Sequence, residues 1–256
     1  ICHETYKTEA GNWVEPADVI EGDGDTFVHA ETREAVTIGR SEKMSKSKKN
    51  VIDPEDIIST YGADTARWFM LSDSPPERDL DWTESGITGA WRFSNRLWRL
   101  VAANADSLPP VGTTPEAADI RRPVHAAIAG VTENLEAFHF NRSVARVHEL
   151  VNALSDVDAA KDGAALREGL ETVTLLIGPM MPHLAEELWR MLGHDILVAD
   201  SPWPVADDSL LVQDTVKLAV QVRGKMRGTV EIAHDADQAT AENAALALPT
   251  VTAALD

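Results

Sequence analysis

The chain has 256 residues, 44% of them hydrophobic, which is enough to bury a core and form one or two domains. No apolar run approaches the roughly 18 to 20 residues of a membrane span, and the start at Ile1 lacks the pattern of a signal peptide. We therefore expect a piece of a longer cytoplasmic protein. Cys2 is the only cysteine, which excludes an intrachain disulfide. No histidine joins a Cys or His at zinc-ligand spacing, so we expect no bound metal.

The formal net charge of −19 at pH 7 argues against nucleic-acid binding over the whole surface of the protein, because phosphate contacts depend on clustered Lys and Arg. Two windows are nevertheless basic. Residues 33–49 hold six basic and two acidic side chains, and residues 217–227 hold four basic side chains and no acid. We expect an acidic body that meets a polyanion through these windows, although acidity for solubility alone explains most of the other charges equally well.

Residues 1–38 are expected to form a small β insertion. Turn residues are dense in this segment, and its hydrophobic periodicity is poor. Two runs rich in β-branched and aromatic residues predict brief strands at 26–30 and 35–38.

Residues 39–81 are expected to hold a basic loop followed by short helices. Asp53 and Pro54 stand in the order of a capping carboxylate and a first-turn proline, so a helix should begin here. This helix should end near Gly62. Asp64 is predicted to cap the helix that follows.

Residues 82–199 are expected to form an antiparallel helical bundle, because apolar residues recur there at helical spacing. Asn141 is predicted to cap the third helix of this bundle, and Gly193 is predicted to end the last one. The positions predicted to be buried are Phe93, Leu97, Leu100 and Val101; Val124, Ile128, Val131, Leu135 and Phe138; Val144, Val147, Val151 and Leu154; and Leu166, Leu170, Val173 and Ile177.

The pattern changes after residue 199. Residues 200–213 are predicted to be a linker, and residues 214–256 an incomplete α+β domain. Alternating apolar and polar residues predict a hairpin that turns at Gly224 and Lys225, and a helix is predicted to begin near Thr240. A hairpin with one helix is marginally stable alone, so we expect this domain to be truncated. The whole chain is therefore predicted to be mainly α.

The strongest local signal is Lys-Met-Ser-Lys-Ser at residues 43–47, a match expected by chance about once in several thousand chains of this length. It resembles the KMSKS signature of class I aminoacyl-tRNA synthetases, which activate an amino acid with ATP and load it on tRNA. Residues 48–50, Lys-Lys-Asn, depart from the Leu-Gly-Asn common in valine and isoleucine enzymes, which favours leucine. Residues 51–54 and 61–67 resemble class I synthetases for branched aliphatic amino acids in general. Further segments resemble leucyl-tRNA synthetases in the expected order, namely residues 74–82, 182–189, 202–204 and 220–228.

The resemblance implies a role for this loop in the reaction with ATP. When a carboxylate attacks the α-phosphorus of ATP, negative charge grows on the phosphoryl oxygens and the departing pyrophosphate, so nearby ammonium groups lower the barrier. Lys46 is the predicted catalytic residue and Lys43 its helper. Met44, Ser45 and Ser47 complete the predicted ATP-binding set, since the small serines let the loop approach phosphates closely. The alternative interpretation is a solvated basic loop before a helix.

The resemblance also assigns the other parts of the chain. The segment from about Glu4 to Val36 corresponds to the leucine-specific insertion, and the helical region corresponds to the domain named for anticodon binding. Residues from Thr215 onward correspond to the start of the small carboxy-terminal domain that reaches the tRNA elbow. Candidate phosphate contacts there are Lys217, Arg223, Lys225 and Arg227, although a solvated hairpin face explains these residues equally well.

Other catalytic parts of the family are not recognisable in this chain. It has no HIGH-like His-x-Gly-His segment and nothing that matches a leucine pocket or an editing domain, all of which precede residue 1 in the family. We therefore expect the intact, monomeric enzyme to bind leucine, ATP with Mg²⁺, and tRNA(Leu), and this piece alone to bind no cofactor and to be inactive. The alternatives are a stand-alone tRNA-binding module, or the tail of a valyl-, isoleucyl- or methionyl-tRNA synthetase.

Overall fold

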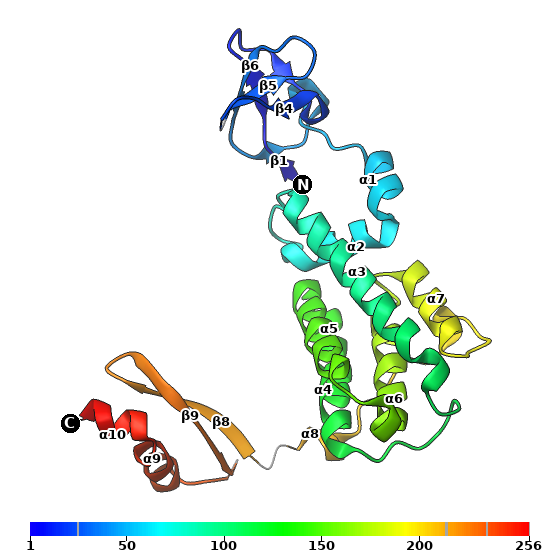
Figure 1. The fold of residues 1–256 in the computed structure, drawn as a ribbon, viewed down its shortest axis with the longest axis vertical. Helices are drawn as coiled ribbons and strands as arrows, with labels where there is room; N and C mark the ends of the chain where they lie inside the picture. Colours follow the sequence, from blue (N-terminus) through cyan, green and yellow to red (C-terminus); the bar gives the residue numbers. More distant parts are fainter. Residues whose placement is uncertain (25, 213–214, 234, 256) are drawn as a thin grey trace. The chain divides into compact units, whose positions relative to one another are not determined.

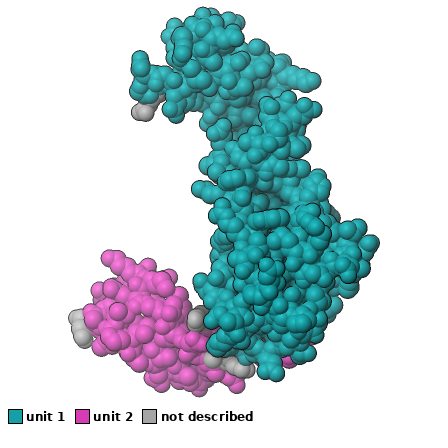
Figure 2. Space-filling model, turned by 45° about the vertical axis from the view of Figure 1, so that its right-hand side comes forward, with its two compact units in different colours: residues 1–206 teal, residues 207–256 magenta. Residues whose placement is uncertain are grey.

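The computed structural model describes residues 1–24, 26–212, 215–233 and 235–255. It contains two compact units, Ile1–Ala206 and Asp207–Asp256, which are teal and magenta in Figure 2. Helices dominate, so the prediction of a mainly α chain with small sheets is confirmed (Figure 1). Within the described residues, no helix combines the length and apolar character needed to cross a membrane.

A small antiparallel sheet forms the first part of unit 1. The prediction of strands at 26–30 and 35–38 is confirmed by β5 and β6, and three further strands accompany them. These extra strands are only two or three residues long, too short for an alternating pattern to appear in the sequence. The order is β3-β2-β6-β5-β4, with β2 at Tyr6–Thr8, β3 at Trp13–Val14, β4 at Val19–Glu21, β5 at Phe27–His29 and β6 at Ala35–Ile38.

A second ladder connects the amino-terminal strand to both the basic loop and the helices. Strand β1 (Cys2–His3) pairs antiparallel with β7 (Glu42–Lys43). On the other side of β1, the Cys2 N–H donates to the Leu80 carbonyl at 2.7 Å, and the Trp82 N–H donates to the Cys2 carbonyl at 2.8 Å. The base of the loop is therefore tied by backbone hydrogen bonds to the segment that leads into the helical bundle.

The two short helices after the loop begin differently from each other. Helix α1 (Pro54–Tyr61) starts as predicted, because the Asp53 carboxylate accepts from the Glu55 N–H at 2.9 Å. Helix α2 (Ala63–Asp73) begins after Gly62, which has no side chain to cap it. The prediction that Asp64 caps α2 is wrong, since Asp64 lies inside the first turn and accepts a hydrogen bond from another helix.

The bundle consists of α3 (Glu84–Asn104), α4 (Ala118–Glu136), α5 (Phe140–Ser155), α6 (Ala159–Ile177) and α7 (Pro182–Met191), as Figure 1 shows. Its core also includes Trp68 and Phe69 of α2. Nearly all of the predicted apolar stripe is buried, with Leu100 and Leu135 partly buried beside it. Helical spacing therefore predicted this core well. Short 3-10 turns lie at Pro16–Asp18, Lys46–Lys48, Ala105–Ser107 and Val198–Asp200.

Two predictions about the α4–α5 connection are wrong. Phe138 is 64% exposed, because α4 ends at Glu136 and Phe138 takes a left-handed conformation with φ 58°. Asn141 is the second residue of α5 and does not cap it. The capping position belongs to His139, whose side chain makes no capping hydrogen bond. Both errors come from placing the helix boundary a few residues too late in the sequence.

Unit 2 contains α8 (Asp208–Leu211), β8 (Thr215–Val222), β9 (Lys225–Ala233), α9 (Gln238–Leu246) and α10 (Pro249–Leu255). The predicted hairpin and helix are confirmed, but the turn residues are Arg223 and Gly224, because Lys225 already pairs with Val222. Both turn residues have positive φ, 53° and 77°, as two-residue hairpin turns require. Among the described residues of the unit, the buried apolar ones are Val230, Ile232 and Val251.

Candidate functional site

The KMSKS loop, residues 42–50, runs from β7 through a 3-10 turn to the segment before α1. Ser45 opens this turn, since its hydroxyl accepts from the Ser47 N–H at 3.3 Å, and the two hydroxyl oxygens are 2.8 Å apart. Lys49 closes the turn in a left-handed conformation with φ 55°. The two serines therefore define the loop's shape, and they also leave it free of bulky side chains.

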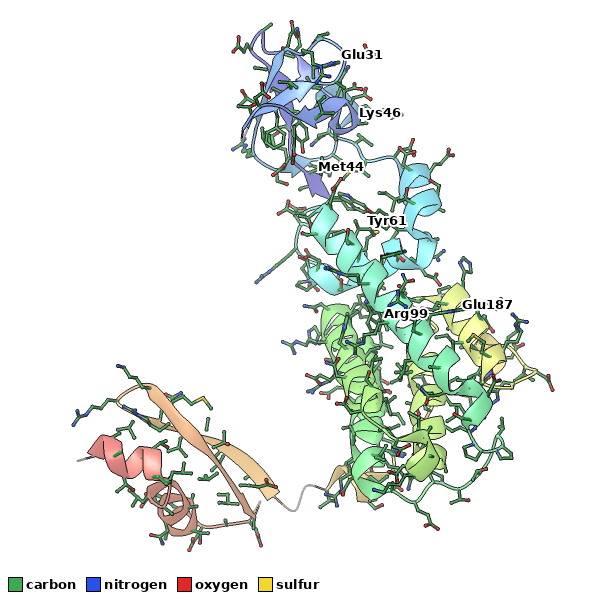
Figure 3. All side chains as sticks on the ribbon, viewed as in Figure 1. Glu31, Met44, Lys46, Tyr61, Arg99 and Glu187 are labelled. Atoms are coloured by element: carbon green, nitrogen blue, oxygen red, sulfur yellow. The ribbon has the colours of Figure 1, made fainter. Side chains whose placement is uncertain are left out.

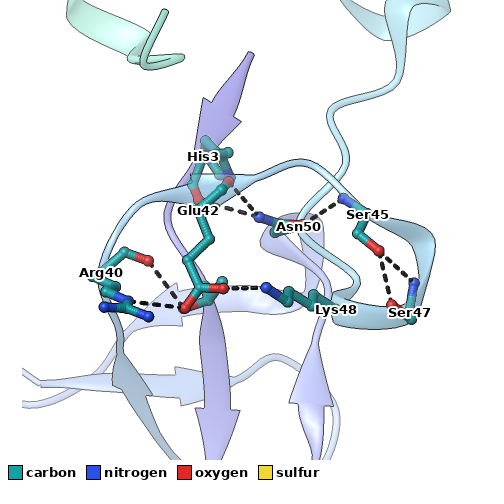
Figure 4. Close-up of polar contacts among 8 residues, drawn as sticks. His3, Arg40, Glu42, Ser45, Ser47, Lys48 and Asn50 are labelled. Atoms are coloured by element: carbon teal, nitrogen blue, oxygen red, sulfur yellow. Dashed lines mark hydrogen bonds and ion pairs between the residues drawn. The ribbon is translucent and has the colours of Figure 1, made fainter. Parts of the chain in front are cut away.

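Asn50 holds the two ends of the loop together (Figure 4). Its side chain is fully buried, and its amide nitrogen donates to the carbonyls of His3 at 3.2 Å and Glu42 at 3.1 Å. Its amide oxygen accepts from the Ser45 N–H at 2.8 Å. One side chain thus satisfies three backbone groups from three segments, and removing it would leave these groups unpaired.

The four lysines of the loop differ in whether they have an ion-pair partner. Lys48 forms an ion pair with Glu42, and Lys49 lies 3.9 Å from the Glu15 carboxylate. Lys43 and Lys46 are exposed, and among the residues that the structure describes neither has an ion-pair partner. Figure 3 marks Lys46 and Met44 on this loop. The two lysines of the signature are therefore the ones whose charge is available to a ligand.

Glu42 is the acid at the centre of this arrangement. It accepts from Lys48 and, at 3.1 Å, from the Arg40 Nε. These hydrogen bonds, the one from Lys48 first, lower the pKa of the Glu42 carboxyl below its usual value. Glu42 is therefore ionised at neutral pH. Glu42 and Asn50 are not among the site residues predicted from the sequence, although Glu42 is the single acid among the basic residues of the loop.

Met44 lies on an apolar groove of about 460 Å³ at the base of the loop. Ile1, Val51, Ile58 and Met70 line the same groove, and all four are more than 40% exposed. The groove offers almost no polar atoms. It can accept an apolar surface, such as another protein segment or the face of a ring, but it cannot hold a charged group.

The basic hairpin residues occupy different environments. Arg223 and Lys225 are exposed at the turn, where a phosphate could reach them. Arg227 is half-buried, and among the described residues its Nε has no hydrogen-bond partner. Lys217 lies in β8, but its side chain is outside the described part of the chain.

No metal-binding group is assembled by the part of the chain that the structure describes. None of its His, Cys, Asp and Glu side chains gather in groups of three or more with the geometry to hold an ion.

Comparison with known proteins places this loop in a defined context. The family described as "tRNA synthetases class I (I, L, M and V)" matches residues 27–83, which include the whole loop. The family described as "Anticodon-binding domain of tRNA ligase" matches residues 118–243. Relatives include the leucine--tRNA ligases of Paramagnetospirillum magneticum and Parvibaculum lavamentivorans, which are 60% and 53% identical over all of this chain. The chain belongs to the leucine--tRNA ligase family.

The match covers the chain fully but its relatives only in part. The chain spans 30% and 31% of the lengths of these two ligases. A solved structure with the same fold is the ternary complex of the Agrobacterium radiobacter K84 agnB2 LeuRS with tRNA and LeuAMS. It is 30% identical with a TM-score of 0.67, and the match covers 83% of this chain and 29% of that one. Class I tRNA synthetases use ATP as a substrate, which agrees with the sequence prediction.

Proposed function

We propose that this chain acts as part of a longer leucine--tRNA ligase, in which it supplies the KMSKS loop and helices that bind tRNA. The observation that carries the proposal is the charge state of the loop: Lys43 and Lys46 are exposed and unpaired among the described residues, while Lys48 is paired with Glu42. The membership of the chain in the leucine--tRNA ligase family supports the choice of amino acid.

In the proposed reaction, a leucine carboxylate oxygen attacks the α-phosphorus of ATP, and pyrophosphate leaves with the electron pair of the broken P–O bond. A hydroxyl of the terminal ribose of tRNA then attacks the leucyl carbonyl carbon, and AMP leaves. Lys46 stabilises the negative charge that develops in the first step, and Lys43 assists it. Ser45 and Ser47 keep the turn narrow, and Met44 offers an apolar contact to the nucleotide.

The proposal also gives each segment of the chain a role in the longer enzyme. Residues 1–38 form the leucine-specific insertion, residues 39–81 end the catalytic domain, residues 82–199 bind tRNA, and residues 200–213 link them to the carboxy-terminal part, 214–256. Lys217, Arg223, Lys225 and Arg227 are proposed phosphate contacts. Mg²⁺ is expected with ATP, but the described residues offer no carboxylate cluster for it, so we assign it no step. We expect a cytoplasmic monomer.

The test is aminoacylation of tRNA(Leu) by a full-length protein that carries this chain, supplied in turn with leucine, valine, isoleucine and methionine. We expect leucine to be charged far faster than the other three. The chain of residues 1–256 alone should show no leucine-dependent exchange between ATP and pyrophosphate. Preference for another amino acid, or exchange by the isolated chain free of host synthetase, would contradict the proposal.

A further inference from the structure

Glu42 and Lys48 close a ring around the signature residues. Glu42 lies in β7, directly before the signature residues 43–47. Lys48 directly follows them and is the last residue of the 3-10 turn. Their ion pair therefore links the two flanks of the loop, and Figure 4 shows it on the side of the loop away from the Ser45–Ser47 contact. Arg40 contacts the other carboxylate oxygen of Glu42 at 3.1 Å.

This pairing decides which ammonium groups stay available. A carboxylate within a few ångströms of a lysine offsets most of the charge that the lysine could offer to a phosphate. Glu42 is the residue before Lys43, so it is the nearest acid in the sequence to the signature lysines. Glu42 instead pairs with Lys48 and Arg40, one on each of its two carboxylate oxygens. Among the described residues, Lys43 and Lys46 have no ion-pair partner.

The ion pair contributes little to keeping the loop folded. Asn50, which is fully buried and makes three hydrogen bonds, already joins the ends of the loop. An ion pair between partly exposed side chains typically stabilises a protein only slightly. A role for Glu42 should therefore be visible in the rate of the reaction rather than in the stability of the fold.

We propose that Glu42 is a positioning residue for amino-acid activation: by holding Lys48, it fixes the turn that carries Lys46 and leaves both signature ammonium groups to the phosphates of ATP. This inference rests on the proposed function. It places the effect of Glu42 on the transition state, because a preorganised charge lowers the barrier more than a charge that must first be brought into place. Lys48 is the partner through which Glu42 acts.

The experiment is a double-mutant cycle in the full-length protein, measured by pre-steady-state formation of leucyl-adenylate. Glu42→Gln and Lys48→Gln should each slow adenylate formation by about tenfold, and the double variant should be no slower than either single one, because both remove the same contact. The charge-swapped variant, Glu42→Lys with Lys48→Glu, should recover most of the lost rate. Leucine affinity in the ground state should change by less than about twofold in all of them.

Glu187→Gln is the matched control. It breaks the ion pair between Glu187 and Arg190 in α7, whose atoms are 2.6 Å apart and whose side chains are more exposed than those of Glu42 and Lys48, and it should leave the rate unchanged. Thermal unfolding of each variant checks that the fold is intact, and Lys48→Gln tests the same contact if Glu42→Gln does not fold. Single variants within twofold of the parent rate, or a charge swap as slow as the singles, would overturn the inference. A parent protein that forms no leucyl-adenylate would instead overturn the proposed function.

Discussion

The Asp64 carboxylate accepts a hydrogen bond from the Leu184 N–H at 2.7 Å, although 120 positions separate the two residues in the chain. Helix α7 has no cap of its own, because Met181 precedes it without a capping side chain and Pro182 carries no N–H. Asp64 therefore satisfies one of the free N–H groups at the start of α7. Arg67, whose Nη1 lies 2.7 Å from the same carboxylate, helps to hold Asp64 in place.

Removing this contact should destabilise unit 1. We expect Asp64→Ala to lower the free energy of unfolding by about 1 to 2 kcal/mol, and Asp64→Asn to lower it less, because the amide oxygen can still accept from Leu184. Denaturant unfolding followed by tryptophan fluorescence measures this, since all seven tryptophans lie within residues 1–206. Hydrogen exchange should also accelerate at the Leu184 amide. An Asp64→Ala variant as stable as the parent would show that the contact contributes nothing.

Some of these relationships were predictable from the sequence, and others were not. Burial leaves a helical period in the sequence, so the buried stripe of α6 was predicted correctly. The signature lysines were identified from five adjacent residues. The Asp64–Leu184 contact has no local signal, because its partners are distant in the chain. Glu42 and Lys48 are six residues apart, a spacing that neither a helix nor a strand brings together regularly.

A pair of glycines in the bundle should respond oppositely to alanine. A methyl group on Gly169 of α6 would overlap the Leu154 side chain, whereas one on Gly89 of α3 would meet no atom within 4 Å. Gly169→Ala should destabilise unit 1 by about 1 to 3 kcal/mol despite its better helix propensity. Gly89→Ala should stabilise it by up to about 1 kcal/mol. Unfolding midpoints that move in the same direction for both variants would contradict this account of the packing.

His148 should make unit 1 sensitive to acid. Its ring lies 4.2 Å from the Phe93 ring and 5.9 Å from the Trp68 ring, between centroids. Burial, and secondly the charge of Arg96, lower the pKa of His148 below 6.5. The unfolded chain therefore binds a proton more readily. The free energy of unfolding therefore has its full value, as far as His148 is concerned, above about pH 6.5. It decreases as the pH falls toward the pKa of His148 in the folded protein.

The measurement is the free energy of unfolding of the parent and of His148→Gln at pH 7.5 and pH 5. The parent should lose more stability on acidification than the variant, because the other titrating groups are common to both. The same loss in both proteins would mean that His148 does not titrate differently in the folded state.

The hairpin of unit 2 should contribute to tRNA affinity through charge. In the full-length protein, Arg223→Ala with Lys225→Ala should weaken tRNA binding, while leucine activation stays nearly unchanged. The slope of log binding constant against log salt concentration should become shallower by about two, because two phosphate contacts are lost. Lys7→Ala, which removes an exposed cation from β2, outside the helices proposed to bind tRNA, serves as the control. Equal tRNA affinity of parent and double variant across a salt series would show that these residues are only a solvent-exposed face of the hairpin and do not contact tRNA.

The role of Lys46 in amino-acid activation is tested by substituting this residue in the full-length protein. Pre-steady-state formation of leucyl-adenylate should slow by about 10² to 10³ in Lys46→Ala, because a preorganised charge is lost from the transition state, while ground-state leucine binding changes little. Lys46→Arg should recover part of the rate, and Lys48→Ala should cost less than Lys46→Ala, since Lys48 is paired with Glu42. A Lys46→Ala rate within about threefold of the parent would contradict the role assigned to this residue.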